Sequence, residues 1–419
     1  MIAFYFLAAV LIWLGALSLR GGLKYLAYVR REMSGAKQRY APYASLMAPC
    51  RGLDQGLSEN VSALFMQNYP RYEIIFVTDS ALDPALAVIE NVCAEQRKLK
   101  ANVSTRIVVA GKTIDRGQKV HNLRAAISHV HQASEVFAFV DTDARPGADW
   151  LKALIAPLAN KQVGAATGYR WFIPVKGNLA SRLRAVWNAS IASALGENGW
   201  KNFCWGGAMA VRRATFEELN VLEEWCGTLS DDFALMRAIK RARLWIHFVP
   251  ECLTASHEDC TFRELLEFTT RQLKITRVYA PEFWRAVLSG SFIFVCGFFG
   301  GIILTLVRAA LGFSFIAPLI LLTIVFALGA SKAYVRWRAV TLALAQQQDM
   351  PCRDLFAQLF LWPLASVLYL YNALCALFSR RIEWRGISYE LKSPTETVII
   401  SQRPAEAKTE SGSRITRRA

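Results

Sequence analysis

The sequence has few charged residues for its length, and acidic residues are the scarcer kind. Of 419 residues, 20% are charged, and 33 Asp and Glu face 49 Lys and Arg, which gives a formal net charge of +16. A charged fraction this low argues against an ordinary soluble enzyme. Intrinsic disorder is excluded for most of the chain, because 53% of the residues are hydrophobic and 12% are aromatic. The length allows roughly two to three domains of about 150 residues each.

Paired cysteine motifs and internal repeats are also missing. The nine cysteines are scattered, and no two of them form a Cys-x-x-Cys pair. This usage fits a reducing compartment better than a disulfide-stapled secreted fold. The sequence also contains no nucleic-acid-binding module, so we expect no nucleic-acid partner for its basic charge.

The first apolar segment, residues 1–19, carries no charge and is rich in Leu, Ile, Ala and aromatic residues. It is about long enough to cross a hydrocarbon core of roughly 30 Å. A cleaved signal peptide is the alternative, but no basic region precedes the apolar run and no Ala-x-Ala-like site closes it. We expect an N-terminal transmembrane anchor.

The C-terminal membrane region is expected over residues 286–379. It contains three uncharged runs, which are Ala286–Val307, Ala309–Ser331 and Leu355–Ser379. The first two runs, in tandem, favour a transmembrane hairpin over buried core helices. The third contains Gln358, Pro363 and Asn372, so it spans the bilayer, re-enters it or lies in the interface.

Basic residues flank these segments and predict their orientation. They are concentrated between Arg20 and Arg39, after the first segment, and again at Lys332, Arg336 and Arg338. The positive-inside rule places both flanks, and therefore residues 40–285, in the cytoplasm. A fourth full crossing would put the basic residues after Ser379 outside, which favours an interfacial or re-entrant third run. Beside membrane segments, basic charge is best explained by attraction to anionic lipids.

Residues 40–285 contain strand-like apolar runs that alternate with helical patterns. We expect strands at 44–49, 72–78, 105–109 and 136–140, and helices at 57–66, 85–99 and about 120–131. This alternation predicts an α/β domain with parallel strands and right-handed crossovers. Ligands bind such sheets beyond the carboxyl ends of the strands.

Acidic residues follow two of the expected strands. Asp79 ends the strand at 72–78, and Asp141 and Asp143 end the strand at 136–140. Side chains at i and i+2 of an extended chain point to the same side, and two carboxylates placed so repel each other unless a cation neutralises them. Mg²⁺ or Mn²⁺ suits such oxygen ligands and leaves room for substrate phosphates. The alternative is a simple turn, since Asp-Thr-Asp before Arg145-Pro-Gly is also good turn chemistry.

Two further motifs each have a structural and a catalytic interpretation. Asp231 and Asp232 lead into an expected helix at 233–241. In the structural interpretation, Ser230 or Asp231 caps that helix. In the catalytic interpretation, Asp232 is a general base. Arg271, Lys274 and Arg277 recur at helical spacing just before the second membrane segment. They would anchor the helix at the interface or stabilise a leaving diphosphate.

Taken in order, these motifs resemble those of membrane-bound family 2-type glycosyltransferases, in the ceramide glucosyltransferase-like branch. The resemblance covers residues 1–392. The matching segments are Pro49-Cys50-Arg51-Gly52, Asn60 to Glu73, Asp79, Lys119-Val-His-Asn122-Leu123, Asp141-Thr-Asp143, Asp231-Asp232-Phe233 and Arg271-Gln-Leu-Lys274-Ile275. The last motif departs from the family pattern, because it has Lys274 for Arg and Ile275 for Trp. Lysine keeps the charge but loses the bidentate fork. The loss of Trp removes a flat aromatic surface, so acceptor placement or sugar identity can differ from the glucosylceramide enzymes.

The resemblance implies an α/β fold of the GT-A type, with a Rossmann-like mixed sheet between N- and C-terminal transmembrane helices. It also implies a nucleotide-diphosphate sugar donor, most often UDP-linked, a lipid acceptor and inversion at the anomeric carbon. Asp232 would deprotonate the acceptor, and Asp141 and Asp143 would hold Mg²⁺ or Mn²⁺ with the diphosphate. The residues expected at the donor are Asp79, Lys119, Asp141, Asp143, Arg271 and Lys274.

These implications leave several functions open. Glycolipid synthesis is expected first, with a polyprenyl-phosphate sugar transferase and a polysaccharide synthase as alternatives that share the donor chemistry. A non-catalytic membrane adaptor is the alternative of another class, and the retained aspartates speak against it. The aromatic segment 171–205 would floor an acceptor groove or simply pack in the core. We expect the polar residues 401–419 to form a disordered tail.

Overall fold

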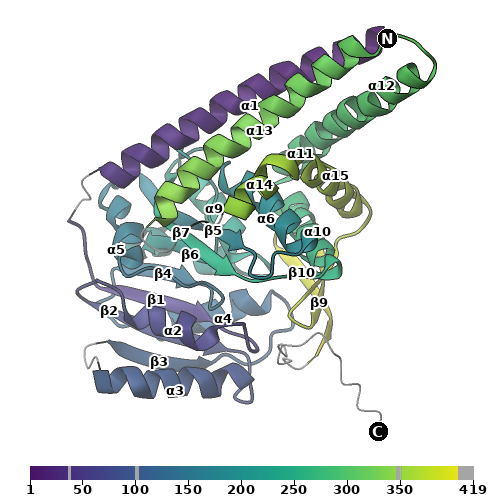
Figure 1. The fold of residues 1–419 in the computed structure, drawn as a ribbon. Coiled ribbons are helices and arrows are strands. Elements are labelled where there is room, and N and C mark those ends of the chain that lie inside the picture. The colour runs from purple at the N-terminus through teal and green to yellow at the C-terminus, as the bar shows by residue number, and fades with distance from the viewer. Residues whose placement is uncertain (36–38, 100–102, 346–349, 351, 404–419) are drawn as a thin grey trace.

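The computed structural model describes residues 1–35, 39–99, 103–345, 350 and 352–403. An α/β domain lies below a group of long helices, and a small C-terminal sheet lies at one side of that domain (Figure 1). The N-terminus is at the far end of the long helices, away from the α/β domain.

The centre of the domain is a seven-stranded sheet of β1 (Ala44–Pro49), β2 (Tyr72–Thr78), β3 (Ser104–Val109), β4 (Val136–Val140), β5 (Val163–Ile173), β6 (Ala208–Arg212) and β7 (Trp245–His257). Its strand order is β3-β2-β1-β4-β6-β5-β7. Strands β3, β2, β1 and β4 are mutually parallel, β5 and β7 pair in parallel, and β6 runs antiparallel to both β4 and β5. The predicted α/β class with a mixed, mostly parallel sheet is confirmed.

Helices cover both faces of this sheet. They are α2 (Leu57–Phe65), α3 (Pro84–Leu99), α4 (Gln118–Ile127), α5 (Trp150–Ile155), α6 (Leu179–Ala192), α7 (Arg213–Glu218), α8 (Val221–Glu224), α9 (Asp231–Arg241) and α10 (Phe262–Tyr279), with a 3₁₀ turn at Ala156–Ala159. Successive side chains of a strand point to opposite faces. Leu46 of β1 therefore joins the buried cluster formed with α2 and α3, and its neighbour Met47 joins the cluster formed with α4 and α9.

The expected elements agree closely with the observed ones. The strands expected at 44–49, 72–78 and 136–140 have the observed bounds, and β3 begins one residue earlier than expected. Helix α4 ends at Ile127 rather than near 131. Beyond its end, the Ser128 hydroxyl donates to the carbonyl oxygen of Ala125 at 2.8 Å, and His129 Nδ1 contacts the same oxygen. Local side-chain bonds of this kind compete with continuation of a helix.

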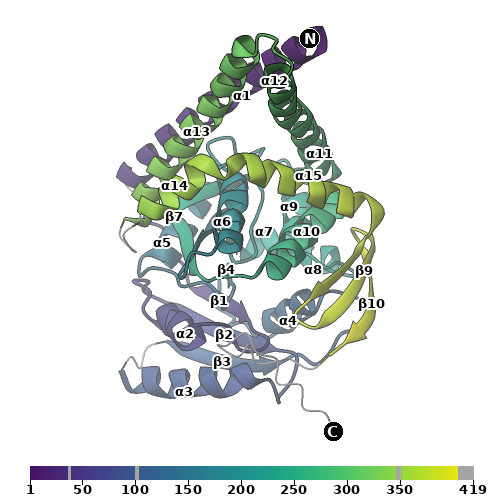
Figure 2. The ribbon, with the colours of Figure 1, turned by 45° about the vertical axis from the view of Figure 1, so that its right-hand side comes forward.

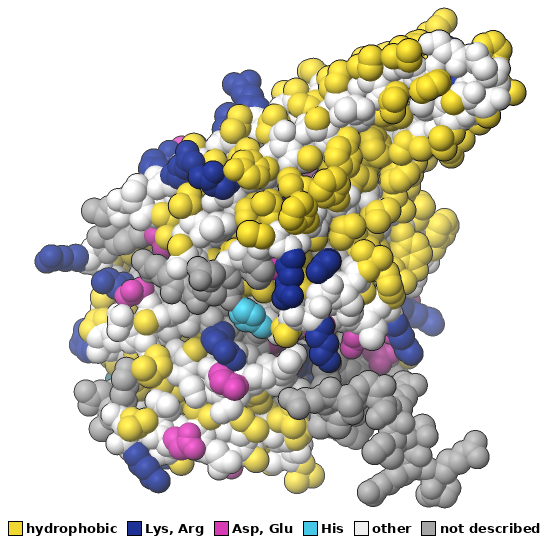
Figure 3. All heavy atoms as spheres, viewed as in Figure 1, with side chains coloured by type: hydrophobic (Ala, Val, Ile, Leu, Met, Phe, Trp, Pro, Cys, Tyr) yellow, Lys and Arg dark blue, Asp and Glu magenta, His cyan; other side chains and the backbone are white. Residues whose placement is uncertain are grey.

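Among the described residues, three helical segments are long and apolar enough to cross a membrane. They are α1 (Ile2–Ser34), α11 (Pro281–Phe294) with its continuation through a π turn into α12 (Gly300–Ala310), and α13 (Ile316–Leu344). Apolar side chains predominate on the face of these helices that Figure 3 shows, and Phe6, Trp13 and Ile303 are each more than 60% exposed. An apolar surface this extensive is typical of a membrane-embedded region.

The expected anchor at 1–19 is the first part of a longer helix. Helix α1 continues to Ser34, and in this second half Tyr25, Tyr28 and Val29 are buried in a cluster that includes Phe248 of β7. Helices α1 and α13 lie side by side in both views (Figures 1 and 2). The apolar helices are thus joined to the α/β domain by packing as well as by the chain.

The third expected membrane run forms two helices, α14 (Cys352–Phe360) and α15 (Trp362–Phe378), which are bent by 60° relative to each other. Pro363 lies in the first turn of α15, where it cannot donate to a preceding turn. Helix α15 lies across the α/β domain (Figure 2), and the Tyr369 hydroxyl donates to the carbonyl oxygen of Trp187 on α6 at 2.7 Å. This contact favours an interfacial or re-entrant segment, which stays a prediction.

The chain ends in a second sheet that the sequence analysis did not anticipate. It consists of β8 (Arg381–Trp384), β9 (Ile387–Ser393) and β10 (Glu396–Gln402), in antiparallel order β10-β9-β8. The predicted tail is therefore wrong for Ser401 and Gln402, because both pair with β9 as part of β10. Residues 404–419 of that tail lie outside the described residues.

Hydrophobic packing joins this C-terminal sheet to the α/β domain. Ile382, Tyr389 and Leu391 of the sheet share a buried cluster with Ile275 of α10 and Leu229, which precedes α9. Ile275 occupies the position where the family motif has Trp, and it is 8% exposed. Its side chain therefore belongs to the contact with the C-terminal sheet.

Gly227 provides a test of this docking. Its φ is +66°, and a Cβ there would overlap the carbonyl oxygen of Thr395 in the turn between β9 and β10. We expect Gly227→Ala to lower the free energy of unfolding by more than the cost of about 1–2 kcal/mol for a left-handed alanine. The matched control is Gly111→Ala, with φ of +79° and open space around it. Thermal unfolding in detergent measures both, and equal shifts would contradict the docking.

Candidate active site

The topology brings three aspartates to one edge of the sheet. Asp79 directly follows β2, and Asp141 and Asp143 directly follow β4. Because β1 pairs in parallel with both strands, their carboxyl ends are about 10 Å apart, which is twice the spacing between neighbouring strands. The turn after β1 lies between them.

That turn contributes Arg51, which the sequence analysis quoted in a motif without assigning it to the site. The Arg51 guanidinium forms an ion pair with the Asp79 carboxylate, and both side chains are less than 10% exposed. The backbone N–H of Gly52 donates to the Asp83 carboxylate at 3.0 Å, which fixes the turn. Asp79 is thus held in a neutralised pair at the sheet edge.

Lys119 lies at the centre of a cluster of four carboxylates, which we call the carboxylate group and which consists of Asp141, Asp143, Asp231 and Asp232. It comes from the first turn of α4, and its Nζ lies 2.8 Å from Asp141 Oδ1, 3.6 Å from Asp231 Oδ1 and 3.2 Å from the carbonyl oxygen of Gly206. Burial lowers the pKa of Lys119, but Asp141 and Asp231 outweigh it and raise that pKa above its ordinary value. Lys119 is therefore a fixed positive charge that joins the end of β4 to the start of α9.

Arg170 is the second central cation, and the sequence analysis missed it. Its Nη2 lies 2.8 Å from Asp143 Oδ1 and 3.7 Å from Asp141 Oδ2, and its guanidinium lies 5.1 Å from the ring centre of Trp205. Burial raises the pKa of Asp143, but Arg170 and Arg385 outweigh it and hold that pKa below its ordinary value. A single charge within the otherwise apolar strand β5 was the signal that could have identified Arg170.

The start of α9 supplies two more carboxylates, and the predicted cap is confirmed. The Ser230 side chain accepts from the backbone N–H of Phe233. Asp232 is half-buried, and its Oδ2 accepts from the backbone N–H of Gly206 at 3.2 Å. The helix therefore has its structural cap, and Asp232 also faces the loop that carries Gly206.

Asp231 is the more deeply buried of the pair. Its Oδ2 makes no hydrogen bond within the described part of the chain. Burial raises the pKa of Asp231 to about 7, with Lys119 opposing this shift and Asp232 adding to it. A side chain at Gly206 would collide with both Asp231 and Lys119, so the loop approaches this charged group as closely as a backbone can.

The basic residues of α10 divide into two groups. Arg271 lies close enough to act electrostatically on Asp143, and burial together with Arg385 and Arg170 lowers the pKa of Arg271 to about 10. Lys274 Nζ donates to the carbonyl oxygen of Arg381 at 2.7 Å and to Ser379 Oγ at 3.3 Å. Arg277 donates to the carbonyl oxygen of Leu377 at 2.8 Å. Arg271 Nη1 also donates to the carbonyl oxygen of Glu383 in β8 at 3.4 Å. All three residues therefore contact the chain from the end of α15 to β8, and Arg271 is in addition within electrostatic range of Asp143.

The carboxylates fit a hard divalent cation in their donor chemistry. Asp143 uses Oδ1 for Arg170, while its Oδ2 makes no hydrogen bond or ion pair among the described residues, and the side chain is 27% exposed. The residues described contain no group of three or more metal-binding side chains. An ion held by Asp141 and Asp143 would therefore take its remaining ligands from water and substrate phosphates, as Mg²⁺ in nucleotide sites does.

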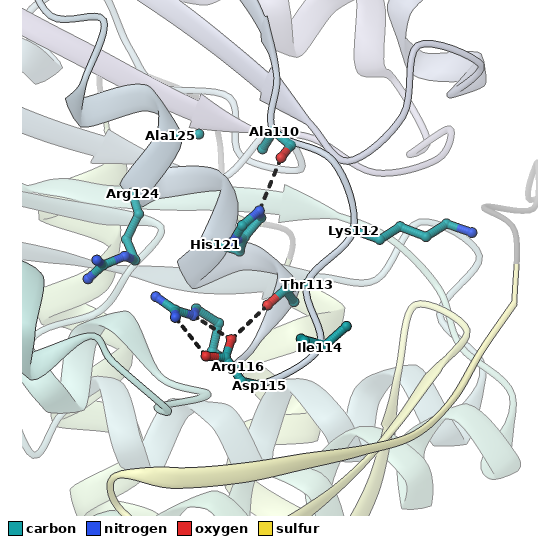
Figure 4. A pocket seen from close by; sticks show the side chains of 9 residues that line it. All are labelled: Ala110, Lys112, Thr113, Ile114, Asp115, Arg116, His121, Arg124 and Ala125. Carbon is teal, nitrogen blue, oxygen red and sulfur yellow. Dashed lines mark hydrogen bonds and ion pairs between the residues drawn. The ribbon is translucent and has the colours of Figure 1, made fainter.

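A separate cavity of about 380 Å³ lies on another side of α4 (Figure 4). It is lined by Lys112, Thr113, Asp115, Arg116, His121, Arg124 and three small or aliphatic side chains. Asp115 is already paired with Arg116 at 2.8 Å, and His121 contacts the carbonyl oxygen of Ala110. None of the predicted donor or catalytic residues lines this cavity, so it is distinct from the carboxylate group.

The aromatic segment is mostly core. Trp171 and Trp187 are at most 2% exposed, as the core-packing alternative predicts, whereas Trp200 is about half exposed. Phe172 and Trp205 both lie against the Arg170 guanidinium, at 5.4 and 5.1 Å from their ring centres, but Phe172 is only 2% exposed. The acceptor-groove interpretation therefore applies at most to the end of the segment.

Comparison with known proteins identifies the family. The sequence profile of glycosyl transferase family 21 matches residues 7–397, which is nearly the whole chain. The chain belongs to glycosyltransferase family 21. Family-21 membership makes it a glycosyltransferase, and the resemblance predicted from its motifs is confirmed.

Individual relatives of this family-21 chain are distant. Ceramide glucosyltransferase 3 of Caenorhabditis elegans is 28% identical over 85 residues, which is 20% of this chain and 18% of that enzyme. The mannosyltransferase PcManGT of Pyrobaculum calidifontis, solved with GDP-mannose and Mn²⁺, is 17% identical with a TM-score of 0.46, covering 89% of this chain and 99% of its own. Glucosyl-3-phosphoglycerate synthase of Mycobacterium tuberculosis, solved with Mn²⁺ and UDP-glucose, is 14% identical with a TM-score of 0.36, over 60% and 82% of the two chains.

Proposed function

We propose that this family-21 glycosyltransferase moves a sugar from a UDP-sugar, such as UDP-glucose, to a hydroxyl group of a membrane lipid. The observation that carries the proposal is the group of Asp141, Asp143, Asp231 and Asp232 around Lys119 and Arg170. This group lies at the carboxyl edge of a sheet in a chain whose remaining helices are long and apolar enough to enter a bilayer.

The donor would lie across the ends of β2, β1 and β4. Asp79, paired with Arg51, would contact the nucleoside, and Lys119, Arg170 and Arg271 would face the diphosphate. Asp141 and Asp143 would hold Mg²⁺ or Mn²⁺, which neutralises charge on the departing diphosphate when bound. Lys274 stays a candidate for steadying the leaving UDP, although its present contacts support a structural role.

Asp232 would act as the general base. The acceptor oxygen attacks the anomeric carbon while the bond from that carbon to the diphosphate oxygen breaks, and the hydroxyl proton passes to the Asp232 carboxylate. One displacement of this kind inverts the anomeric configuration. Asp232 is held for this role by the backbone N–H groups of Gly206 and Phe233, at 3.2 and 2.8 Å.

A lipid acceptor suits the placement of the site. A lipid leaves the bilayer only at a cost of about 0.8 kcal/mol per buried CH₂, so the catalytic domain has to meet it at the membrane surface. Helices α1 and α13 pack on the α/β domain beside β7, and α15 packs on α6 and α10. By the positive-inside rule this domain faces the cytoplasm.

The test is to incubate membranes containing the protein with a panel of radiolabelled UDP-sugars and to extract the lipids. We expect label in the organic phase with one UDP-sugar, and none with membranes carrying the Asp141→Asn, Asp143→Asn double variant. The labelled lipid distinguishes a neutral glycolipid from a polyprenyl-phosphate sugar by its acid lability. Label confined to the aqueous phase as free sugar or polymer would overturn the lipid acceptor.

A further inference from the structure

The C-terminal sheet makes three separate contacts with the α/β domain, two beside the proposed donor site and one with Thr113 in the lining of the separate cavity. The Tyr389 hydroxyl accepts from the backbone N–H of Gln118 at 3.2 Å, next to Lys119. Gln402 Nε2 donates to the carbonyl oxygen of Thr113 at 2.7 Å. The third point is the turn between β8 and β9, Trp384-Arg385-Gly386-Ile387. Residues more than 200 positions beyond the strand-end aspartates thus border the proposed donor site.

Arg385 projects from this turn toward the strand ends. Its Nη1 donates to the carbonyl oxygen of Arg51 at 2.5 Å, and its Nη2 lies 3.0 Å from Asp54 Oδ2. In return, Arg51 Nε donates to the carbonyl oxygen of Arg385 at 3.0 Å. Arg51 in turn pairs with Asp79, so Arg385 is two contacts from the proposed nucleoside-binding aspartate.

Arg385 also lies within electrostatic range of the carboxylates that follow β4. Asp143 and Asp141 act electrostatically on Arg385, as does Asp54. Arg271 lies within electrostatic range of Arg385, and the Arg271 guanidinium carbon lies 5.7 Å from the ring centre of Trp384. A cation here would therefore lie near the carboxylates that are proposed to hold the metal ion, whose other ligands would include phosphate oxygens.

The backbone at Arg385 is an unusual choice for arginine. Both central residues of the two-residue turn have positive φ, 49° at Arg385 and 77° at Gly386. Asn, Asp and Gly are the residues that favour such turns. An arginine in this conformation motivates the hypothesis that its side chain has a role.

We propose that Arg385 is a donor-binding residue that contacts the diphosphate, so that the C-terminal sheet completes the donor site. The inference rests on the proposed function. A guanidinium has five N–H donors, and the present contacts of Arg385 use two nitrogens, Nη1 and Nη2, which leaves donors for phosphate oxygens. Arginine binds phosphate in a bidentate manner that a lysine cannot reproduce.

The test compares Arg385→Asn with wild type in binding UDP and uridine. Asparagine favours the left-handed turn, so this variant removes the charge and keeps the turn. Arg381→Asn is the matched control, because Arg381 is in the same sheet with its side chain 71% exposed. Equilibrium dialysis of the full chain in detergent, with radiolabelled UDP and Mn²⁺ and then with radiolabelled uridine, gives both dissociation constants.

We expect Arg385→Asn to weaken UDP binding by about 10- to 100-fold, the range of a charge-assisted hydrogen bond, and to leave uridine binding and the control unchanged. Arg385→Lys should recover part of the loss. Equal weakening of UDP and uridine would mean that Arg385 only supports the fold, and unchanged UDP binding would exclude the contact. Wild-type protein that binds neither molecule would overturn the proposed function as well as this inference.

Discussion

Replacing Asp232 by asparagine is expected to lower sugar transfer by about 10²- to 10⁴-fold, the contribution of a general base, while leaving UDP binding unchanged. Asparagine keeps the shape of the side chain and its contact to the backbone N–H of Gly206, but it cannot accept the hydroxyl proton. Transfer of label from the UDP-sugar to lipid measures the rate, and equilibrium dialysis with UDP measures binding.

The matched control for this prediction is Asp149→Asn. Asp149 is an exposed residue at the start of α5, away from the four clustered carboxylates, so its replacement should leave sugar transfer unchanged. Full activity in Asp232→Asn together with loss of activity in Asp231→Asn would transfer the role of base to Asp231. Full activity in both variants would remove the start of α9 from the chemistry.

Replacing Asp143 by asparagine is expected to reduce transfer at least about 100-fold, because a metal ion contributes several kcal/mol of charge stabilisation in such reactions. Asp143 is the carboxylate with an oxygen left over after its pairing with Arg170. The variant should also need a higher Mn²⁺ concentration for half-maximal rate. For wild type, EDTA should stop the reaction and added Mn²⁺ or Mg²⁺ should restore it.

Asp115→Asn serves as the control for the loss of one acidic charge. Asp115 belongs to the cavity on the other side of α4, so its removal should leave both the rate and the Mn²⁺ requirement unchanged. An Asp143→Asn enzyme with wild-type metal dependence would contradict the assignment of Asp143 as a ligand. Wild-type activity that persists in EDTA would exclude a metal-dependent mechanism.

Local sequence patterns predicted the central strands of the sheet and the aspartates that follow them. Strands β1, β2 and β4 were found with their observed bounds because each is a short apolar run that is buried on both faces, with turn or helix signals on either side. Parallel topology then placed Asp79, Asp141 and Asp143 at one edge of the sheet. This much follows from periodicity and connection rules.

The remaining part of the site depends on contacts between distant segments. Arg170 reaches Asp143 because β5 joins the sheet beyond β6, and no local signal in the sequence gives that order. Arg385 contacts Arg51 and Asp54 because the C-terminal sheet packs on Ile275. Lys274 donates to the carbonyl oxygen of Arg381 and to Ser379 Oγ, after the end of α15. Sequence spacing grouped Arg271 with Lys274, and both donate to carbonyl oxygens of β8, but Arg271 is also within electrostatic range of Asp143.

The most direct test of the central claim is a structure of the full chain in a lipid nanodisc with UDP and Mn²⁺ bound. The account predicts the nucleoside beside Asp79 and Arg51, the diphosphate and ion between Asp143 and Arg271, and Asp232 facing a space open to the apolar helices. A nucleotide bound instead in the cavity lined by Asp115, Arg116 and His121 would contradict it.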